Sequence, residues 1–192
     1  DIYLLDQILK GRFTKEMKIL DAGCGEGRNT VYFLHEGYQI FGADSNPIAI
    51  QMARIYAQPI QKEYDVYRFQ TSLIEKLPFH HGAFDAIISS AVLHFATSET
   101  HFLKMMEEMM RVLKPGGIFF LRMTTSQGEM QEKSPHLGDG VYLLPDGSER
   151  FLLTDSLEKE IVSKYKFKDL EPAKSVLVHG QRAMGVFVWE KG

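Results

Sequence analysis

The stretch Ile19-Leu20-Asp21-Ala22-Gly23-Cys24-Gly25-Glu26-Gly27-Arg28-Asn29 decides the fold of this chain. Residues 17–21 are mainly apolar, as in a short buried strand, and three glycines follow at alternating positions. Glycine permits a positive φ and has no Cβ, so a ligand is able to lie directly against this backbone. Residues 28–36 then have the pattern of a helix that ends at Gly37. A tight turn does not need three glycines in five positions, so the stretch predicts a ligand-binding loop.

The spacing of these glycines distinguishes two classes of ligand. A dinucleotide-binding loop has the pattern G-x-G-x-x-G, with a pyrophosphate at the helix N-terminus. Here the pattern is G-x-G-x-G and follows Asp21, whose carboxylate repels a phosphate and attracts a cationic ammonium group. The spacing therefore disfavours a nicotinamide dehydrogenase, which stays as an alternative.

Asp44 ends a second predicted strand, residues 38–43, and comes 23 positions after Asp21. An acidic residue at this place in nucleotide-binding folds accepts hydrogen bonds from ribose hydroxyls. The alternative is that Asp44 caps a helix predicted over 47–57, but Ser45 and Asn46 are also available for that role. We therefore favour a ribose-binding role for Asp44.

The rest of the chain alternates short apolar runs with longer amphipathic stretches, which is typical of a mainly parallel α/β sheet. Further strands are expected over 66–70, 84–89, 118–123, 174–179 and 183–190, the last two as a hairpin at the sheet edge. Further helices are expected over 1–10, 98–113 and 154–165. Residues 124–150, rich in Gly, Ser, Asp and Pro, are expected to be an extended connection.

Composition and charge exclude several kinds of protein. The net charge of -3 gives no general attraction to nucleic acid, so no nucleic-acid partner is expected. The single cysteine, Cys24, excludes an internal disulfide and any multi-cysteine metal site, and no metal is expected. No apolar run approaches the roughly 20 residues of a membrane span, and no signal peptide is recognised. We expect a cytoplasmic protein.

Five motifs occur in an order and spacing that resemble class I methyltransferases dependent on S-adenosylmethionine (SAM). They are residues 21–27, Asp44, Leu77-Pro78-Phe79, Phe84-Asp85-Ala86-Ile87 and Arg111-Val112-Leu113-Lys114-Pro115-Gly116-Gly117. They are most similar to the branch with ubiquinone/menaquinone-biosynthesis and tellurite-resistance-type enzymes. The resemblance implies a single Rossmann-like α/β/α domain over 1–192, with a seven-stranded, mainly parallel sheet and one antiparallel strand near the C-terminus. SAM is then expected at the carboxyl ends of the first four strands.

The resemblance also assigns residues to the cofactor. It implies that Asp21, Gly23 and Gly25 line the methionine and ribose portion, that Asp44 binds the ribose hydroxyls and that Ser45 lies under the adenine. Family members often have an Asp after the third strand, but Gln70-Thr71-Ser72-Leu73 contains no acid. Adenine recognition is then left to Thr71, Ser72, Leu73 or the backbone. Arg28 either faces the methionine carboxylate or is an exposed helix residue.

The segment Ser89-Ser90-Ala91-Val92-Leu93-His94-Phe95 follows the fourth strand. Its backbone, from Ser90 on, is expected to pass the methionine end of SAM, with His94 and Phe95 near the methyl group. Two interpretations of His94 are open. It is either a general base for a hydroxyl or amine acceptor, since a histidine pKa lies near neutrality, or a pocket wall that packs and hydrogen-bonds.

The predicted function is methyl transfer from SAM, by in-line displacement, to a small-molecule acceptor, with S-adenosylhomocysteine (SAH) as product. The N-terminal helical segment 1–16 and the loop 124–150 are expected to shape the acceptor site, because long loops in compact domains are usually functional. One alternative is a non-catalytic SAM-binding protein of the same fold. The other is the nicotinamide-dependent oxidoreductase that the glycine spacing disfavours.

Overall fold

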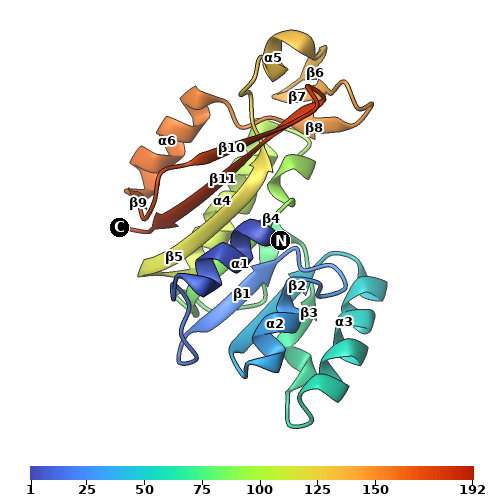
Figure 1. Ribbon diagram of the computed structural model, residues 1–192, viewed down its shortest axis with the longest axis vertical. Helices are drawn as coiled ribbons and strands as arrows, with labels where there is room; N and C mark the ends of the chain where they lie inside the picture. Colours follow the sequence, from blue (N-terminus) through green and yellow to red (C-terminus); the bar gives the residue numbers. More distant parts are fainter.

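The glycine loop connects β1 (Lys18–Ala22) to α2 (Thr30–His35) near the centre of a large mixed sheet (Figure 1). The computed structural model describes residues 1–192. The other strands on the main path of the sheet are β2 (Gln39–Asp44), β3 (Phe69–Thr71), β4 (Phe84–Ser90), β5 (Leu113–Thr124), β10 (Lys174–Val178) and β11 (Arg182–Glu190). They are ordered β10-β11-β5-β4-β1-β2-β3, and β1 pairs in parallel with both β2 and β4. The predicted strands are therefore present, with their ends shifted by a few residues.

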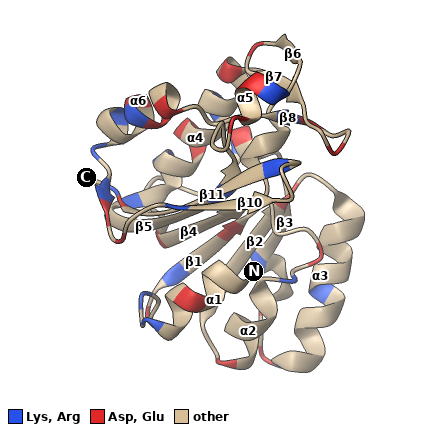
Figure 2. Ribbon diagram, turned by 45° about the horizontal axis from the view of Figure 1, so that its top comes forward, with Lys and Arg blue, Asp and Glu red and all other residues tan.

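Helices cover both faces of the sheet, which gives the predicted three layers (Figure 2). On one face lie α1 (Ile2–Leu9), α2 and α3 (Pro47–Ile60); on the other lie α4 (Glu99–Val112) and α6 (Asp155–Tyr165). The strands serve both cores because successive side chains point to opposite faces. In β5, for example, Phe119 packs with the α4 side and Phe120 with the α1–α3 side. None of the helices is long and apolar enough to cross a membrane.

The main sheet has one strand more than the seven that were expected. The main sheet has eight strands, because β9 (Lys168–Asp169) pairs with the last residues of β11. β11 is antiparallel to each of its neighbours β5, β9 and β10, so it alone runs against the others. A two-residue strand has no side-chain period, and the sequence gives no signal for it.

Residues 124–150 are more ordered than the extended connection expected from their composition. They contain α5 (Met130–Lys133), β6 (His136–Gly138) and β7 (Val141–Leu143), and β8 (Glu149–Phe151) completes a separate three-stranded antiparallel sheet. Met130, Tyr142 and Leu144 are buried in a small core of their own. The Phe151 ring stacks on Phe102 of α4 with centroids 4.9 Å apart, which joins this small sheet to the main core.

The stacked pair predicts how the small sheet depends on the main core. Phe151→Ala is expected to lower the free energy of unfolding by about 3–5 kcal/mol, the usual cost of a buried Phe-to-Ala truncation, because only 1% of Phe151 is exposed. Leu143→Ala in the same sheet is the control, since Leu143 is 37% exposed, and is expected to cost under about 1 kcal/mol. Urea unfolding measures both. Equal effects would contradict the docking role of Phe151.

Candidate functional site

The three glycines of the loop all have a positive φ: 83° at Gly23, 54° at Gly25 and 86° at Gly27. Their surroundings differ. A Cβ on Gly23 would collide with the methyl groups of Val92, whereas a Cβ on Gly25 would meet no atom within 4 Å. Gly23 is therefore required by close packing between two loops, and Gly25 leaves backbone open toward the space above the sheet.

Asp44 holds this loop from the neighbouring strand. Its Oδ2 accepts a hydrogen bond from the Gly25 amide at 2.9 Å, and its Oδ1 accepts one from the Asn46 amide at 2.9 Å. The helix-capping role belongs to Asn46, whose Oδ1 accepts hydrogen bonds from the amides of Ile48 and Ala49. Asp44 is thus directed at the glycine loop and does not cap α3.

A cavity of about 400 Å³ opens beside this loop, which is within the range of small-molecule sites. Five residues that the sequence singled out line it: Gly23, Asp44, Ser45, Leu73 and Phe95. The remaining lining residues are Ile74, Glu75, Ala91, Val92, His101 and Met105. The cavity lies where the connections after β1 and β4 leave toward opposite faces of the sheet. Open α/β sheets bind ligands at such a topological switch point.

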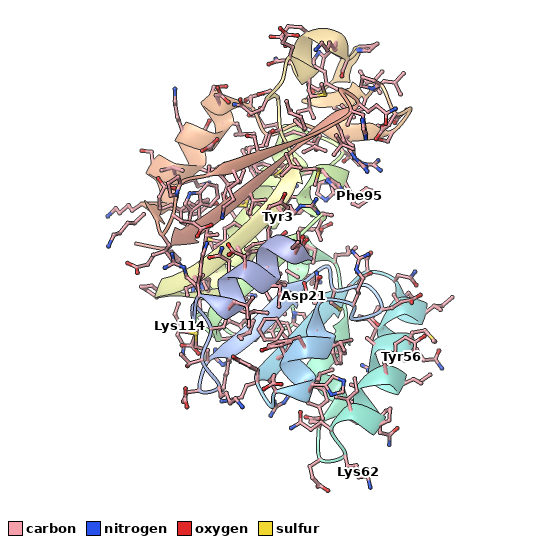
Figure 3. The ribbon with its side chains drawn as sticks, viewed as in Figure 1. Tyr3, Asp21, Tyr56, Lys62, Phe95 and Lys114 are labelled. Atoms are coloured by element: carbon pink, nitrogen blue, oxygen red, sulfur yellow. The ribbon has the colours of Figure 1, made fainter.

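Asp21 lies at the end of β1 in the middle of the molecule (Figure 3) and is 1% exposed. Its Oδ2 is buried and has no hydrogen-bond partner. Burial raises the pKa of Asp21 to about 7, and the nearby Asp44 carboxylate adds to the shift. A buried carboxyl group without a partner is costly to fold. Asp21 is not among the residues that line the 400 Å³ cavity, although the strand that carries it leads directly to Gly23, which lines it.

The segment after β3 carries a second unpartnered polar atom. The Ser72 amide donates to the Asp44 carbonyl at 2.9 Å, which ties this segment to β2. The Ser72 Oγ is buried and has no partner. Thr71 is exposed and does not line the cavity. Of the two polar side chains considered for the missing acid, Ser72 is the one whose oxygen is buried and unpartnered, but it does not line the cavity either.

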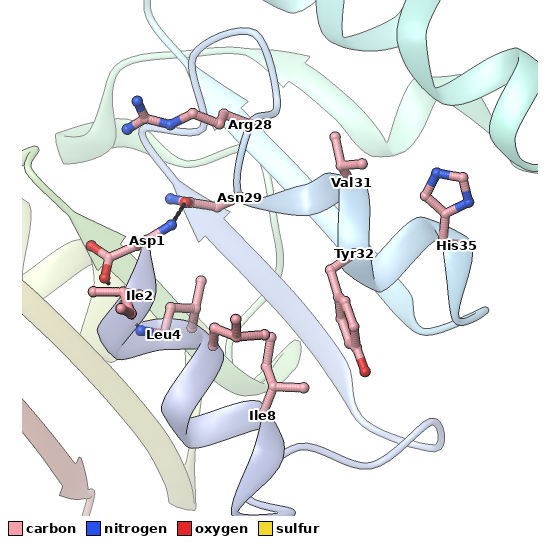
Figure 4. Close-up of a pocket in the computed structure, with 10 residues that line it drawn as sticks. Asp1, Ile2, Leu4, Ile8, Arg28, Asn29, Val31, Tyr32 and His35 are labelled. Atoms are coloured by element: carbon pink, nitrogen blue, oxygen red, sulfur yellow. Dashed lines mark hydrogen bonds between the residues drawn. The ribbon is translucent and has the colours of Figure 1, made fainter.

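Arg28 and Ser90 do not line the 400 Å³ cavity. Ser90 Oγ donates a hydrogen bond to Asp1 Oδ2 at 2.7 Å. Arg28 is exposed and lines a different cavity of about 510 Å³, whose walls are α1 and α2 (Figure 4). That larger cavity is lined by side chains such as Ile2, Leu5 and Val31, and it contains neither the glycines nor Asp44.

His94 belongs to the one-turn 3-10 helix η3 (Leu93–Phe95), between the main sheet and the small sheet. The side chain is buried and its Nδ1 has no hydrogen-bond partner. Burial lowers the pKa of His94 to about 4, and positive charge from Arg150, Arg182 and Arg122 lowers it further. At neutral pH the imidazole is therefore uncharged. Its neighbour Phe95 is exposed and lines the cavity, as expected for a residue near the ligand.

Four cavity residues lie outside the segments that the sequence analysis assigned to the ligand: Ile74, Glu75, His101 and Met105. Ala91 has φ 62°, a conformation that a non-glycine residue rarely adopts and that often occurs at functional sites. Its amide donates to the Arg122 carbonyl at 2.7 Å, which holds it in place. Nothing in the sequence signals this strain, because alanine gives no local preference for it. Glu75 and His101 lie 3.6 Å apart on η2 (Ile74–Lys76) and α4, a contact that only the tertiary structure creates.

The fold is that of a Rossmann-like α/β protein with a cavity at the switch point of its sheet. A model of the methyltransferase domain family matches residues 20–121, and the chain belongs to this family. An uncharacterized methyltransferase of Synechocystis is 36% identical over 104 residues. That alignment covers 54% of this chain and 45% of the relative, so the chain matches about half the length of this curated relative.

Two solved structures share the fold. A SAM-dependent methyltransferase from Methanosarcina mazei is 23% identical, with a TM-score of 0.75 and 96% of each chain covered. The 1,6-didemethyltoxoflavin-N1-methyltransferase of Burkholderia thailandensis is 19% identical, with a TM-score of 0.67, covering 96% of this chain and 75% of that one. The latter structure contains bound 1,6-didemethyltoxoflavin and SAH.

Replacing each of the two glycines by alanine is expected to affect a different property: Gly23→Ala mainly the stability, and Gly25→Ala mainly ligand binding. Gly23→Ala is expected to lower the free energy of unfolding by at least about 2 kcal/mol, through overpacking against Val92 and a strained φ. Gly25→Ala is expected to cost only about 1–2 kcal/mol, from φ alone, but to block the open face of the loop. SAH binding by titration calorimetry and unfolding by urea separate the two effects.

The double variant Gly23→Ala/Val92→Ala is the control for the steric argument. It is expected to recover part of the stability lost by Gly23→Ala relative to Val92→Ala alone, because the smaller side chain makes room for the new Cβ. No recovery would show that the φ strain, and not the packing of the two loops, accounts for the loss.

Asp21 predicts a pH dependence of stability. Because its pKa is raised in the folded protein, from 3.8 to about 7, its contribution favours folding below pH 4 and is lost as the pH rises through 7. Asp21→Asn is therefore expected to raise the free energy of unfolding at pH 8 by more than about 1.4 kcal/mol, the equivalent of one pKa unit. The gain should shrink at pH 5. Exposed Glu160→Gln is the charge-matched control, and urea unfolding at both pH values measures the difference. A gain independent of pH would contradict the assignment.

Proposed function

We propose that this chain is a SAM-dependent methyltransferase that transfers the methyl group to a small-molecule acceptor by in-line displacement. The observation that carries the proposal is the cradle formed by Gly23, Gly25 and Asp44 beside the 400 Å³ cavity. Membership of the methyltransferase domain family supports it, as does SAH in a structure of the same fold.

The residues around the cavity fit the chemical groups of SAM. The buried Asp21 carboxyl group, which has an unpartnered oxygen, suits the methionine ammonium group. Asp44 lies at the carboxyl end of β2, where an acidic residue accepts hydrogen bonds from ribose hydroxyls in nucleotide-binding folds. Ser72 Oγ, unpartnered and buried, is assigned to the adenine edge, and Ser45 and Leu73 to the walls around the ring. Gly25 leaves room for the ligand to lie against the backbone.

SAM supplies a methyl group already activated by its sulfonium, so the protein contributes mainly alignment and exclusion of water. Ala91, Val92 and Phe95 provide the wall on which an acceptor is oriented. The small sheet β6–β8, next to η3, closes the acceptor side, which is the role we propose for residues 124–150. Within one domain over 1–192, cofactor and acceptor are then held by separate parts of the chain.

We keep His94 as a proposed base for acceptors that must lose a proton. Its uncharged state at neutral pH leaves it able to accept one. A base with a pKa of about 4 is weak, however, and acts effectively only if the bound acceptor raises that pKa. The pocket-wall interpretation of His94 requires no such change. Arg28, Thr71 and Ser90 stay predicted cofactor contacts. Like Asp21, Gly25 and Ser72, they are not among the residues that line the 400 Å³ cavity.

The finer branch and the two alternative functions stay open to direct tests. The branch with quinone-biosynthesis and tellurite-resistance-type enzymes is a prediction from the five motifs. A non-catalytic SAM-binding protein would bind SAH. It would form no SAH when it is incubated with SAM and each acceptor of a panel. A nicotinamide oxidoreductase would bind NAD in competition with SAH. The unpartnered Asp21 carboxyl group disfavours NAD as the ligand.

The central prediction concerns Asp44. Asp44→Asn removes the charge and leaves a single oxygen for the two amides, of Gly25 and Asn46, that its carboxylate now satisfies. SAH binding by titration calorimetry is expected to weaken at least tenfold, because hydrogen bonds to charged groups contribute about 1.5–3 kcal/mol. Asp65→Asn is a matched control, since Asp65 Oδ1 accepts from the Tyr67 amide two residues ahead, outside the cavity. Unchanged SAH binding in Asp44→Asn, or no SAH binding by the wild-type protein, would overturn the proposed function.

A further inference from the structure

A second cavity, of about 300 Å³, adjoins the first one on the side of the small sheet. Ala91 and Phe95 line both cavities, so the two spaces share a wall. The other residues that line the second cavity are His94, Arg122, Thr124, Ser148, Arg150, Val178, Arg182 and Met184. They come from β5, η3, β10 and β11 of the main fold and from the segment that contains β8.

The lining of this second cavity, which we call the arginine pocket, is strongly basic. Arg122, Arg150 and Arg182 all line it, and no Asp or Glu does. The chain as a whole has a net charge of -3, whereas the lining of this pocket carries a local positive charge from three arginines. Figure 2 shows Lys and Arg in blue at the end of the β10–β11 hairpin that faces the small sheet. Charges of one sign in a concave site focus the electrostatic potential on a ligand of opposite sign.

The arginines retain unused binding capacity. Arg150 forms no ion pair; its Nη1 donates to the Glu149 carbonyl at 2.6 Å, and its guanidinium lies 4.7 Å from the centroid of the Phe95 ring. Arg182 Nη1 is 3.6 Å from Asp146 Oδ2, beyond a normal hydrogen bond. Arg122 Nη1 donates to Asp1 Oδ2 at 3.3 Å, but its Nε is buried without a partner. A guanidinium offers five donors in a planar fork that matches a carboxylate or phosphate.

We propose that the arginine pocket binds an anionic group of the methyl acceptor, a carboxylate or a phosphate, and thereby selects acidic acceptors. This assignment rests on the proposed function, because the shared wall of Ala91 and Phe95 is what places the rest of the acceptor beside the cofactor cavity. Arg150 and Arg182 bind the anion, and Arg122, already paired with Asp1, closes the inner side of the pocket. Neutral acceptors of the same shape leave these charges without a partner and are rejected.

Anion binding also has a consequence for His94, which lines the same pocket. Burial is the largest cause of its low pKa, and the charges of the three arginines lower it further. A bound anion offsets their charge, which raises the pKa of His94 toward its ordinary value and makes it a better proton acceptor. The acidic acceptor would then activate the base that it needs, while the empty pocket keeps His94 neutral.

The test uses three probes with one aromatic ring: benzoate, phenyl phosphate and neutral benzamide. Titration calorimetry with SAH-saturated protein is expected to show that at least one of the two anions binds at least fivefold more tightly than benzamide. The tighter anion identifies which class, carboxylate or phosphate, the pocket prefers. Arg150→Gln and Arg182→Gln remove one charge each while keeping much of the side chain, and each is expected to weaken binding of that anion at least fivefold.

Lys62→Gln is the charge-matched control, because Lys62 is exposed and lies at the far end of the molecule (Figure 3). It is expected to change anion binding less than twofold. Equal binding of benzamide and both anions, or arginine variants that behave like Lys62→Gln, would overturn the proposal. SAH affinity is measured in the same variants and is expected to stay within twofold. If the wild-type protein binds no SAH, the proposed function fails, while the same three titrations without SAH still decide whether the pocket binds anions.

Discussion

Parallel pairing of β1 with β2 on one side and β4 on the other is the constraint on which the site depends. Its register sets Ala22 beside Ala43, and Asp21 beside both Gly42 and Ile88. The loops that follow the three strands therefore start at the same edge of the sheet. Because the connections after β1 and β4 leave toward opposite faces, they separate there and leave a crevice. The Asp44–Gly25 hydrogen bond and the fit of Gly23 against Val92 then fix the shape of its floor.

Several buried polar groups on the strands and loops around the crevice and the adjoining arginine pocket are held at a cost to stability. Asp21 is buried without a partner for its Oδ2, and Ser72 Oγ and His94 Nδ1 lack partners as well. Ala91 adds backbone strain at φ 62°. Such costs are tolerated only where the surrounding structure determines the conformation, and they gather at functional sites. Here the surrounding structure is the largely buried β1 and β4, whose residues belong to both hydrophobic cores.

The cofactor side of the crevice was largely predictable from sequence because its signals are local. The buried strand, the three glycines and the acid 23 positions after Asp21 are all recognisable within one short stretch of the chain. The other strands are recognisable from alternating or continuous apolar runs. The small sheet was not predictable in this way. Its strands have three residues each, too few for a period, and the connections between them are rich in Gly and Asp, which is typical of loops. Glu75 and His101 reach the cavity only through tertiary packing.

The acceptor side depends on contacts of this long-range kind. Arg122 lies on β5, Arg150 on β8 and Arg182 on β11. No regular spacing in the sequence relates the three residues. No hydrogen bond or ion pair joins the glycine loop or Asp44 to any of the three. Substitutions in residues 124–150 are therefore able to change the charge and shape of the acceptor pocket while the cofactor cradle stays intact. This separation is a physical reason why one methyltransferase fold serves many acceptors. Under the proposed function, the acceptor is therefore sought through the chemistry of the arginine pocket and not through the glycine loop.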